Sequence, residues 1–136
     1  MLSDLTDEDQ ARLDAQRTVV RTEVRARYGE GMRSDSRALG QLQRLLDDGV
    51  FASSQRYELQ CIGICWGDTL CAMAPFRWMM VTDDYGHDPT LQWKDTTITI
   101  HALTMISKRV ENGEQVDVEW LAQKAIERAT ATEQGQ

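Results

Sequence analysis

The chain has few of the residues that mark secreted, membrane-spanning or metal-binding proteins. It contains 136 residues, with only two His, two Pro and three Cys. Its first residues lack the basic and apolar stretches of a secretion signal, and no apolar run is long enough to span a bilayer. An odd number of cysteines makes a disulfide framework unexpected. These absences predict a cytoplasmic protein without a membrane segment.

Recognisable catalytic motifs are also missing. The sequence has no GxSxG string, no phosphate-binding loop and no dinucleotide fingerprint. Cys61 and Cys65 lie one helical turn apart, but structural zinc prefers CxxC spacing with two further ligands, so both are expected to pack as small hydrophobes. His101, among strand threonines, is expected to be a satisfied polar residue. The sequence therefore predicts no catalytic residue, no metal and no cofactor.

Acidic residues outnumber basic ones, 22 to 15, which gives a net charge of −7. Binding to nucleic acids or anionic membranes needs clustered Lys and Arg, so neither partner is expected. A basic protein partner is favoured electrostatically. The same acidic balance also serves solubility alone.

The length fits one domain over residues 1–136, with residues 1–5 and 130–136 expected to fray. Apolar periodicity and end signals predict five helices. We expect them over 6–28, from Asp35 or Ser36 to Val50, from Ser53 or Ser54 to Ala74, around 103–112 and over 117–129. Strands are expected over 76–82, 91–94 and 97–101. The predicted fold is α+β: a helical N-terminal half, a small antiparallel three-stranded meander and two C-terminal helices.

The third helix is expected to be the buried centre of the domain, because Cys61–Gly67 is apolar on nearly every side. Gly63 and Gly67 lie one turn apart and form a smooth strip that another element can approach closely. That element could belong to the same chain or to a second copy in a homodimer.

The segment Asp83–Pro89 is the most distinctive in the chain, with three carboxylates and one imidazole in six residues. Turn chemistry accounts for this composition, since Asp, Gly and Pro all favour loops. The same groups could hold a divalent ion or act as acid and base. An exposed acidic loop with Tyr85 beside it would also make a protein-binding epitope.

Part of the chain resembles an uncharacterised bacterial domain-of-unknown-function family. The residues that carry the resemblance are Gly67–Asp68, Leu70, Trp78, Val81, Asp83, Tyr85–Gly86, Asp88–Pro89, Leu91 and Leu103–Glu111. They cover roughly the central and C-terminal half. The family carries no established activity, so the resemblance implies a fold and a bacterial source but no function.

These observations favour a non-catalytic binding protein, and specifically a bacterial immunity protein that neutralises a cognate toxin acting in the cytosol. The expected partner-binding residues are Asp83, Asp84, Tyr85, His87 and Asp88, with Trp93 as an aromatic anchor. Two alternatives remain. One is a small metal-dependent enzyme that uses the Asp83–Asp88 loop. The other is a structural or regulatory homodimer that pairs through the Gly63 and Gly67 strip.

Overall fold

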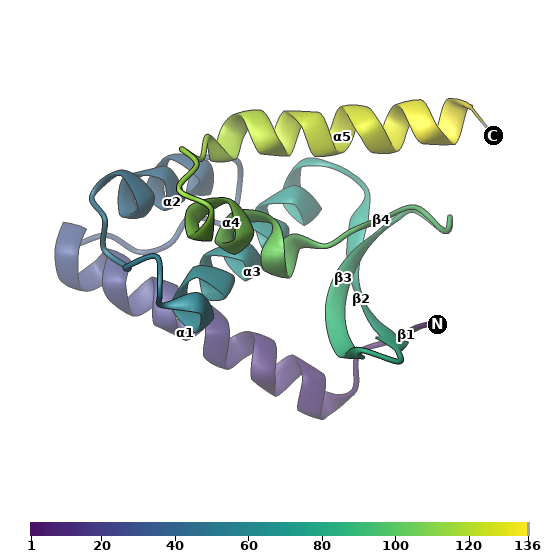
Figure 1. Ribbon diagram of the computed structural model, residues 1–136, viewed down its shortest axis with the longest axis horizontal. Coiled ribbons are helices and arrows are strands. Elements are labelled where there is room, and N and C mark those ends of the chain that lie inside the picture. Colours follow the sequence, from purple (N-terminus) through teal and green to yellow (C-terminus); the bar gives the residue numbers. More distant parts are fainter. Residues whose placement is uncertain (136) are drawn as a thin grey trace.

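Five helices and four strands make up residues 1–135, the part of the chain that the computed structural model describes (Figure 1). They are β1 (Leu2–Ser3), α1 (Asp7–Tyr28), α2 (Ala38–Asp47), α3 (Arg56–Met73), β2 (Phe76–Asp83), β3 (Gly86–Trp93), β4 (Thr99–Ile100), α4 (Ala102–Glu111) and α5 (Val118–Gln134). The strands form one antiparallel sheet in the order β1-β2-β3-β4. The predicted α+β class is confirmed.

Helix α1 begins and ends where the sequence predicts. Thr6 Oγ1 accepts a hydrogen bond from Asp9 N at 3.1 Å, and the Asp9 carboxylate accepts one from Thr6 N at 2.9 Å. This reciprocal pair is a capping box, which satisfies two N–H groups that the first turn would leave free. Gly29 ends the helix with a left-handed φ of 68°.

Helix α3 lies at the centre of the molecule, as predicted, and the other helices and the sheet surround it (Figure 1). Its two inner glycines allow close packing within the same chain. A Cβ atom at position 63 would lie 2.5 Å from the carbonyl oxygen of Ala102 in α4. A Cβ at position 67 would lie 2.5 Å from the indole of Trp78 in β2. The glycine strip is therefore occupied by α4 and β2 of the same chain, and a homodimer that pairs through it would have to displace them.

Two polar contacts fix the elements that surround α3. The Asp68 carboxylate accepts two hydrogen bonds from the Arg17 guanidinium in α1, both at 2.8 Å, and one from Trp78 Nε1 at 2.9 Å. Trp66 is fully buried and its Nε1 donates to the carbonyl oxygen of Val118 at 3.0 Å, which holds the start of α5. These bonds matter because a buried indole N–H without a partner would be destabilising.

The sheet differs from the predicted meander in two places. Residues 83–89, expected to be a loop, form a tight hairpin in which only Asp84 and Tyr85 lie outside the strands. Strand β3 can include Pro89 because this part of the strand is at the edge of the sheet. Strand β4 pairs only with Leu91 and Gln92, so Pro89 has β2 as its one neighbouring strand. The last strand is shorter than expected and covers only Thr99–Ile100.

Both chain ends are more ordered than predicted over the described residues. Leu2 and Ser3, expected to fray, form β1 by pairing with Val81 and Met80, which adds a strand to the three that were predicted. Near the other end, α5 continues to Gln134, and only Gln136 of the predicted frayed segment lies outside the described residues. The side-chain cap expected for α2 at Asp35 or Ser36 is also absent, since that helix begins after Arg37.

The glycine contacts give a direct test of the packing around α3. Gly63→Ala and Gly67→Ala should each lower the free energy of unfolding by roughly 1–3 kcal/mol, because the added methyl group meets backbone or ring atoms. Gly40→Ala is the matched control, since a Cβ there on α2 would have no atom within 4 Å. It should stabilise the protein by up to about 1 kcal/mol through helix propensity. Urea unfolding of the three variants measures this, and equal stability of all three would contradict the packing.

Candidate functional site

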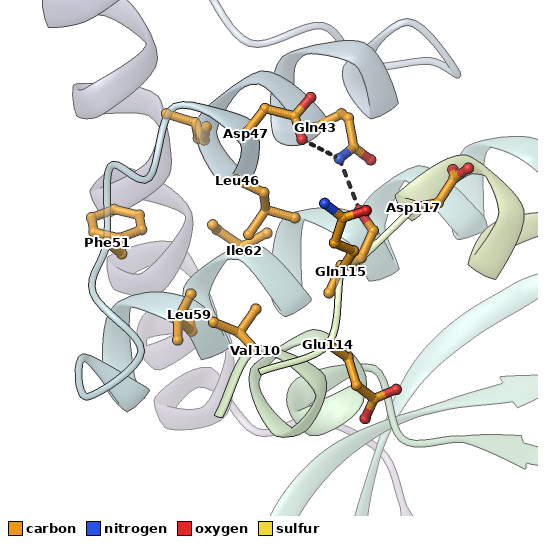
Figure 2. A pocket seen from close by; sticks show the side chains of 12 residues that line it. Gln43, Leu46, Asp47, Phe51, Leu59, Ile62, Val110, Glu114, Gln115 and Asp117 are labelled. Atoms are coloured by element: carbon orange, nitrogen blue, oxygen red, sulfur yellow. Dashed lines mark hydrogen bonds between the residues drawn. The ribbon is translucent and has the colours of Figure 1, made fainter. Parts of the chain in front are cut away.

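A hollow with a volume of 760 Å³ lies between α2, α3, α4 and the segment that joins α4 to α5. We call it the acidic groove. Figure 2 shows its side chains, with apolar groups on the floor and polar groups along the rim. The floor residues are Leu45, Leu46, Phe51, Leu59, Ile62, Val110 and Val116, and the rim residues are Gln43, Asp47, Glu114, Gln115 and Asp117.

The side chain of Gln43 holds the two walls of the acidic groove together. Its Nε2 donates to the Asp47 carboxylate at 2.9 Å and to the carbonyl oxygen of Val116 at 2.8 Å (Figure 2). Its Oε1 accepts from Val118 N at 2.9 Å. Asp117 in turn caps α5 by accepting from Trp120 N at 3.0 Å. Because these bonds tie the 114–118 segment to α2, the groove exists before any ligand arrives.

The rim of the acidic groove is negative. It carries the carboxylates of Asp47, Glu114 and Asp117, and none of its lining residues within the described chain is basic. Of these carboxylates, Glu114 makes a long ion pair, with 3.8 Å between it and Arg109. Apolar side chains such as Leu46 and Phe51 remain partly exposed on the floor. An apolar floor with an anionic rim suits a segment that presents hydrophobic and basic side chains together.

The expected partner-binding residues lie elsewhere, on the β2–β3 hairpin. The Asp83 carboxylate accepts a hydrogen bond from Tyr85 N at 2.8 Å, which closes the turn and leaves the Tyr85 side chain 97% exposed. Asp84, His87 and Asp88 are exposed as well. In Figure 1 this turn lies at the lower right, away from α2 and the α4–α5 connection. The hairpin and the acidic groove are therefore two separate surfaces.

His87 has two partners that the sequence did not reveal. Its Nε2 lies 3.2 Å from the carboxylate of Asp9, and its Nδ1 lies 2.7 Å from Thr82 Oγ1. Because a carboxylate only accepts, Nε2 donates to Asp9, and the neutral ring can then accept from the Thr82 hydroxyl through Nδ1. The three side chains form a carboxylate–imidazole–hydroxyl series beside a hollow of 260 Å³ that Tyr57 and Gln60 also line.

Asp9 is a buried carboxylate held in its charged form. The backbone N–H of Thr6 lowers its pKa well below the usual range, although burial opposes this, and bonds from Arg12 and His87 lower it further. The Arg12 guanidinium lies 2.5 Å from its oxygen. Sequence reasoning placed Asp9 only in the first turn of a helix. The Thr-x-x-Asp spacing signals a cap, but nothing local to Asp9 indicates a contact with a residue 78 positions away.

Two other candidate residues have structural roles. Trp93, expected to be an aromatic anchor for the partner, is only 4% exposed and packs edge-on against Phe76 with ring centroids 5.0 Å apart, while its Nε1 donates to Glu133. It therefore offers no surface to a partner. His101 lies on the exposed surface with its Nδ1 3.4 Å from Thr90 Oγ1.

The cysteines are unreactive in this environment. Burial raises the pKa of Cys61 to about 11 and those of Cys65 and Cys71 to about 12, so all three are neutral thiols at pH 7 and poor nucleophiles. Among residues 1–135, no three His, Cys, Asp or Glu side chains come together in a way that could hold a metal ion. Over the same residues, no helix combines the length and the apolarity needed to cross a membrane.

Comparison with known proteins identifies the family. Residues 38–121, more than half of the chain, match the family described as Domain of unknown function (DUF3806). The chain belongs to this family, which confirms the expected resemblance. Every residue that lines the acidic groove lies between Gln43 and Asp117, inside the matched region, whereas Asp9 and Arg12 lie outside it.

A solved structure shares the fold. It is a crystal structure at 1.50 Å resolution of a protein from Bacteroides thetaiotaomicron VPI-5482, with a TM-score of 0.86 and 18% sequence identity. The match covers 94% of this chain but 47% of that one, so this chain spans about half the length of its structural relative. No curated protein sequence matches the chain. At this identity the likeness shows the fold alone.

The contacts of Asp9 predict a pH-dependent effect on stability. Asp9→Asn should destabilise the protein at pH 7, because the charged acceptor of the Thr6, Arg12 and His87 bonds is lost. Since the pKa of Asp9 is lower in the folded state than its unfolded value of about 3.9, its contribution is complete above that value and disappears as pH falls through the folded pKa. Urea unfolding at pH 7, 5 and 3 should show wild type and variant converging towards acid.

Asp7→Asn is the control for this measurement, since Asp7 is an exposed acidic residue in the same helical turn, where its charge interacts with the helix dipole. It should change stability much less than Asp9→Asn at pH 7. A gap between wild type and Asp9→Asn that stays constant down to pH 3 would contradict the assigned role.

Proposed function

We propose that this protein is a non-catalytic binding protein whose acidic groove receives a segment of a partner protein that carries both apolar and basic side chains. The observation that carries the proposal is the combination of a preformed apolar floor with a rim of Asp47, Glu114 and Asp117. Partner affinity comes mainly from apolar groups that fill such a hollow, while complementary charges at the rim set specificity and the rate of association.

The specific form of this proposal is a bacterial immunity protein that acts in the cytoplasm and neutralises a cognate toxin. A toxin that acts on nucleotides or RNA needs a basic substrate-binding surface, and a compact protein of net charge −7 with an anionic groove is suited to cover it. The three free, uncharged thiols fit a reducing compartment. Neutralisation by occlusion requires no catalytic group on the inhibitor.

Partner capture by the full chain tests the groove directly. The tagged wild type should recover one major protein from its native bacterium at near-equal amount. The variant Asp47→Lys/Glu114→Lys should bind that protein at least roughly tenfold more weakly, since a loss of about 1.4 kcal/mol is sufficient for that change. Purified components in a calorimetric titration give the affinities.

Glu23→Lys/Asp95→Lys is the matched control, because it makes the same change in net charge by breaking only exposed ion pairs with Arg27 and Arg77. It should bind like wild type. The immunity role has a second test, in which the captured partner is expressed in a test host and growth is scored with and without this protein. Equal binding by both double variants excludes the groove, and toxicity without rescue excludes immunity.

A small enzyme built on His87 is the second candidate, favoured by the Asp9–His87–Thr82 series. A carboxylate that orients an imidazole, which in turn accepts from a hydroxyl, is the arrangement that activates an oxygen nucleophile. No grouping of ligands for a metal supports the metal-dependent version within the described residues.

This candidate predicts hydrolysis of an activated ester such as p-nitrophenyl acetate, measured by nitrophenolate release. His87→Gln should lower the rate by about 100-fold or more, as expected for loss of a general base. His101→Gln should leave the rate unchanged, since that imidazole contacts only Thr90 among polar side chains of the described chain. Equal rates for the two variants would exclude catalysis by His87.

A further inference from the structure

A second groove, between α4 and α5, has the opposite charge to the acidic groove. It has a volume of 410 Å³, and its lining contains three basic residues and one acidic residue. We call it the basic groove. Its apolar and aromatic residues are Ile100, Met105, Trp120, Leu121, Ala125 and Ala131, and its charged residues are Arg109, Lys124, Glu127 and Arg128. The protein as a whole has a net charge of −7, so this groove is a local excess of positive charge. It favours binding of a negatively charged group.

The guanidinium of Arg109 is poorly satisfied within the described chain. Its Nε is the one buried side-chain polar atom of residues 1–135 without a hydrogen-bond partner. Its terminal nitrogens make only long contacts, 3.8 Å to Glu114 and 4.0 Å to the sulfur of Met105. An arginine has five N–H donors and binds carboxylates strongly. Arg109 therefore has donor capacity left for a carboxylate that enters the basic groove.

The α5 side of the basic groove is a stripe of one aromatic and two cationic side chains. Trp120, Lys124 and Arg128 are spaced four residues apart, so they lie along one helix edge over about 12 Å. The Trp120 side chain is 53% exposed, and the Lys124 ammonium lies 5.6 Å from its ring. Arg128 forms no ion pair with any described residue. Such a stripe fits a short segment that has one aromatic side chain beside carboxylates.

The β2–β3 hairpin tip carries this complementary chemistry. Asp83 and Asp84 are exposed carboxylates, and Tyr85 between the strands is almost fully exposed at 97%. The tip cannot reach the basic groove of its own chain, because in Figure 1 it lies at the lower right, at the end of the β2–β3 hairpin that points away from α5, which runs along the top. Contact between the two surfaces therefore requires two molecules.

We propose that the hairpin tip of one molecule docks in the basic groove of a second copy of this chain. Tyr85 lies against Trp120, and the carboxylates of Asp83 and Asp84 face Arg109 and Arg128. Aromatic contact supplies the apolar area, and the Arg109 donors receive the partners that its own chain does not provide. This self-association uses neither the acidic groove nor the glycine strip, so it is independent of the proposed partner binding.

The contact is expected to be weak, because one aromatic side chain and two carboxylates bury much less than the roughly 1,200 Å² of a stable interface. A tip and a groove are different surfaces, so each molecule has one of each to offer. A closed dimer forms when the tip of each molecule docks in the groove of the other. A linear polymer forms when each tip docks in the groove of a further molecule. In either case the weight-average mass rises with protein concentration.

Sedimentation equilibrium at physiological salt, over rising protein concentration, tests the proposal. The tip variant is Asp83→Asn/Asp84→Asn/Tyr85→Ser, in which the amide oxygen at position 83 can still close the turn. The groove variant is Arg109→Gln/Arg128→Gln, with Arg128→Gln alone as a second variant that leaves the partly buried Arg109 in place. Wild type should show a mass that rises with concentration, and each variant alone should stay monomeric.

Mixing the tip variant with the groove variant gives the decisive result. The mixture retains one intact tip and one intact groove, so association should return as a one-to-one complex. Net charge cannot explain this pattern, because the tip variant has two fewer negative charges than the wild-type value of −7 and repels itself less. The control Glu23→Gln/Asp35→Asn makes the same charge change on α1 and the 29–37 loop and should associate like wild type.

Three outcomes would overturn the proposal. These are a wild type that stays monomeric at every concentration, variants that associate as wild type does, and a mixture that fails to recover the complex. Circular dichroism and thermal unfolding of each variant establish that it is folded before its mass is compared.

Discussion

The close approach of α4 and Trp78 to the glycine face of α3 sets the positions of most other elements. Without side chains at 63 and 67, α3 lies deep enough to contact α1, α2, α4, α5 and the sheet together. One helix then serves several surfaces. Leu59 and Ile62 form the floor of the acidic groove, while Asp68 binds α1 and β2 on another side. A larger residue at either glycine would displace the walls of the groove along with the core.

The sequence predicted what depends on local periodicity. It located all five helices, the buried character of α3 and the need for close packing at its glycines, because these follow from residue spacing along a single segment. It missed features that depend on pairing across the chain. Leu2–Ser3 is too short to show a strand pattern, and the turn formers of 83–89 look like a loop until the opposing strand sets their register. The acidic groove could not be predicted, since its residues come from segments up to 74 positions apart, between Gln43 and Asp117.

Surfaces of opposite sign lie on the two sides of the connection between α4 and α5. Glu114 and Asp117 face the acidic groove, while Arg109 and Trp120, only a few residues away, face the basic groove. A protein with a uniform negative surface would repel other acidic molecules in every orientation. Because this protein has one acidic and one basic groove, its electrostatic interaction with a partner depends on their relative orientation. Specific association is thereby favoured over non-specific association. The family match covers the acidic groove completely but ends at residue 121, so it excludes the part of the basic groove formed by Lys124 and Arg128.

The hydrogen bond from Trp66 to Val118 also bears on how the protein folds during synthesis. The indole lies at the centre of the core, but the carbonyl oxygen that satisfies it is 52 residues further along the chain. A nascent chain that ends before Val118 can form α1 and α3 but leaves the central indole N–H without its native partner, so the core cannot be completed. Completion of the core therefore requires the start of α5 to have left the ribosome.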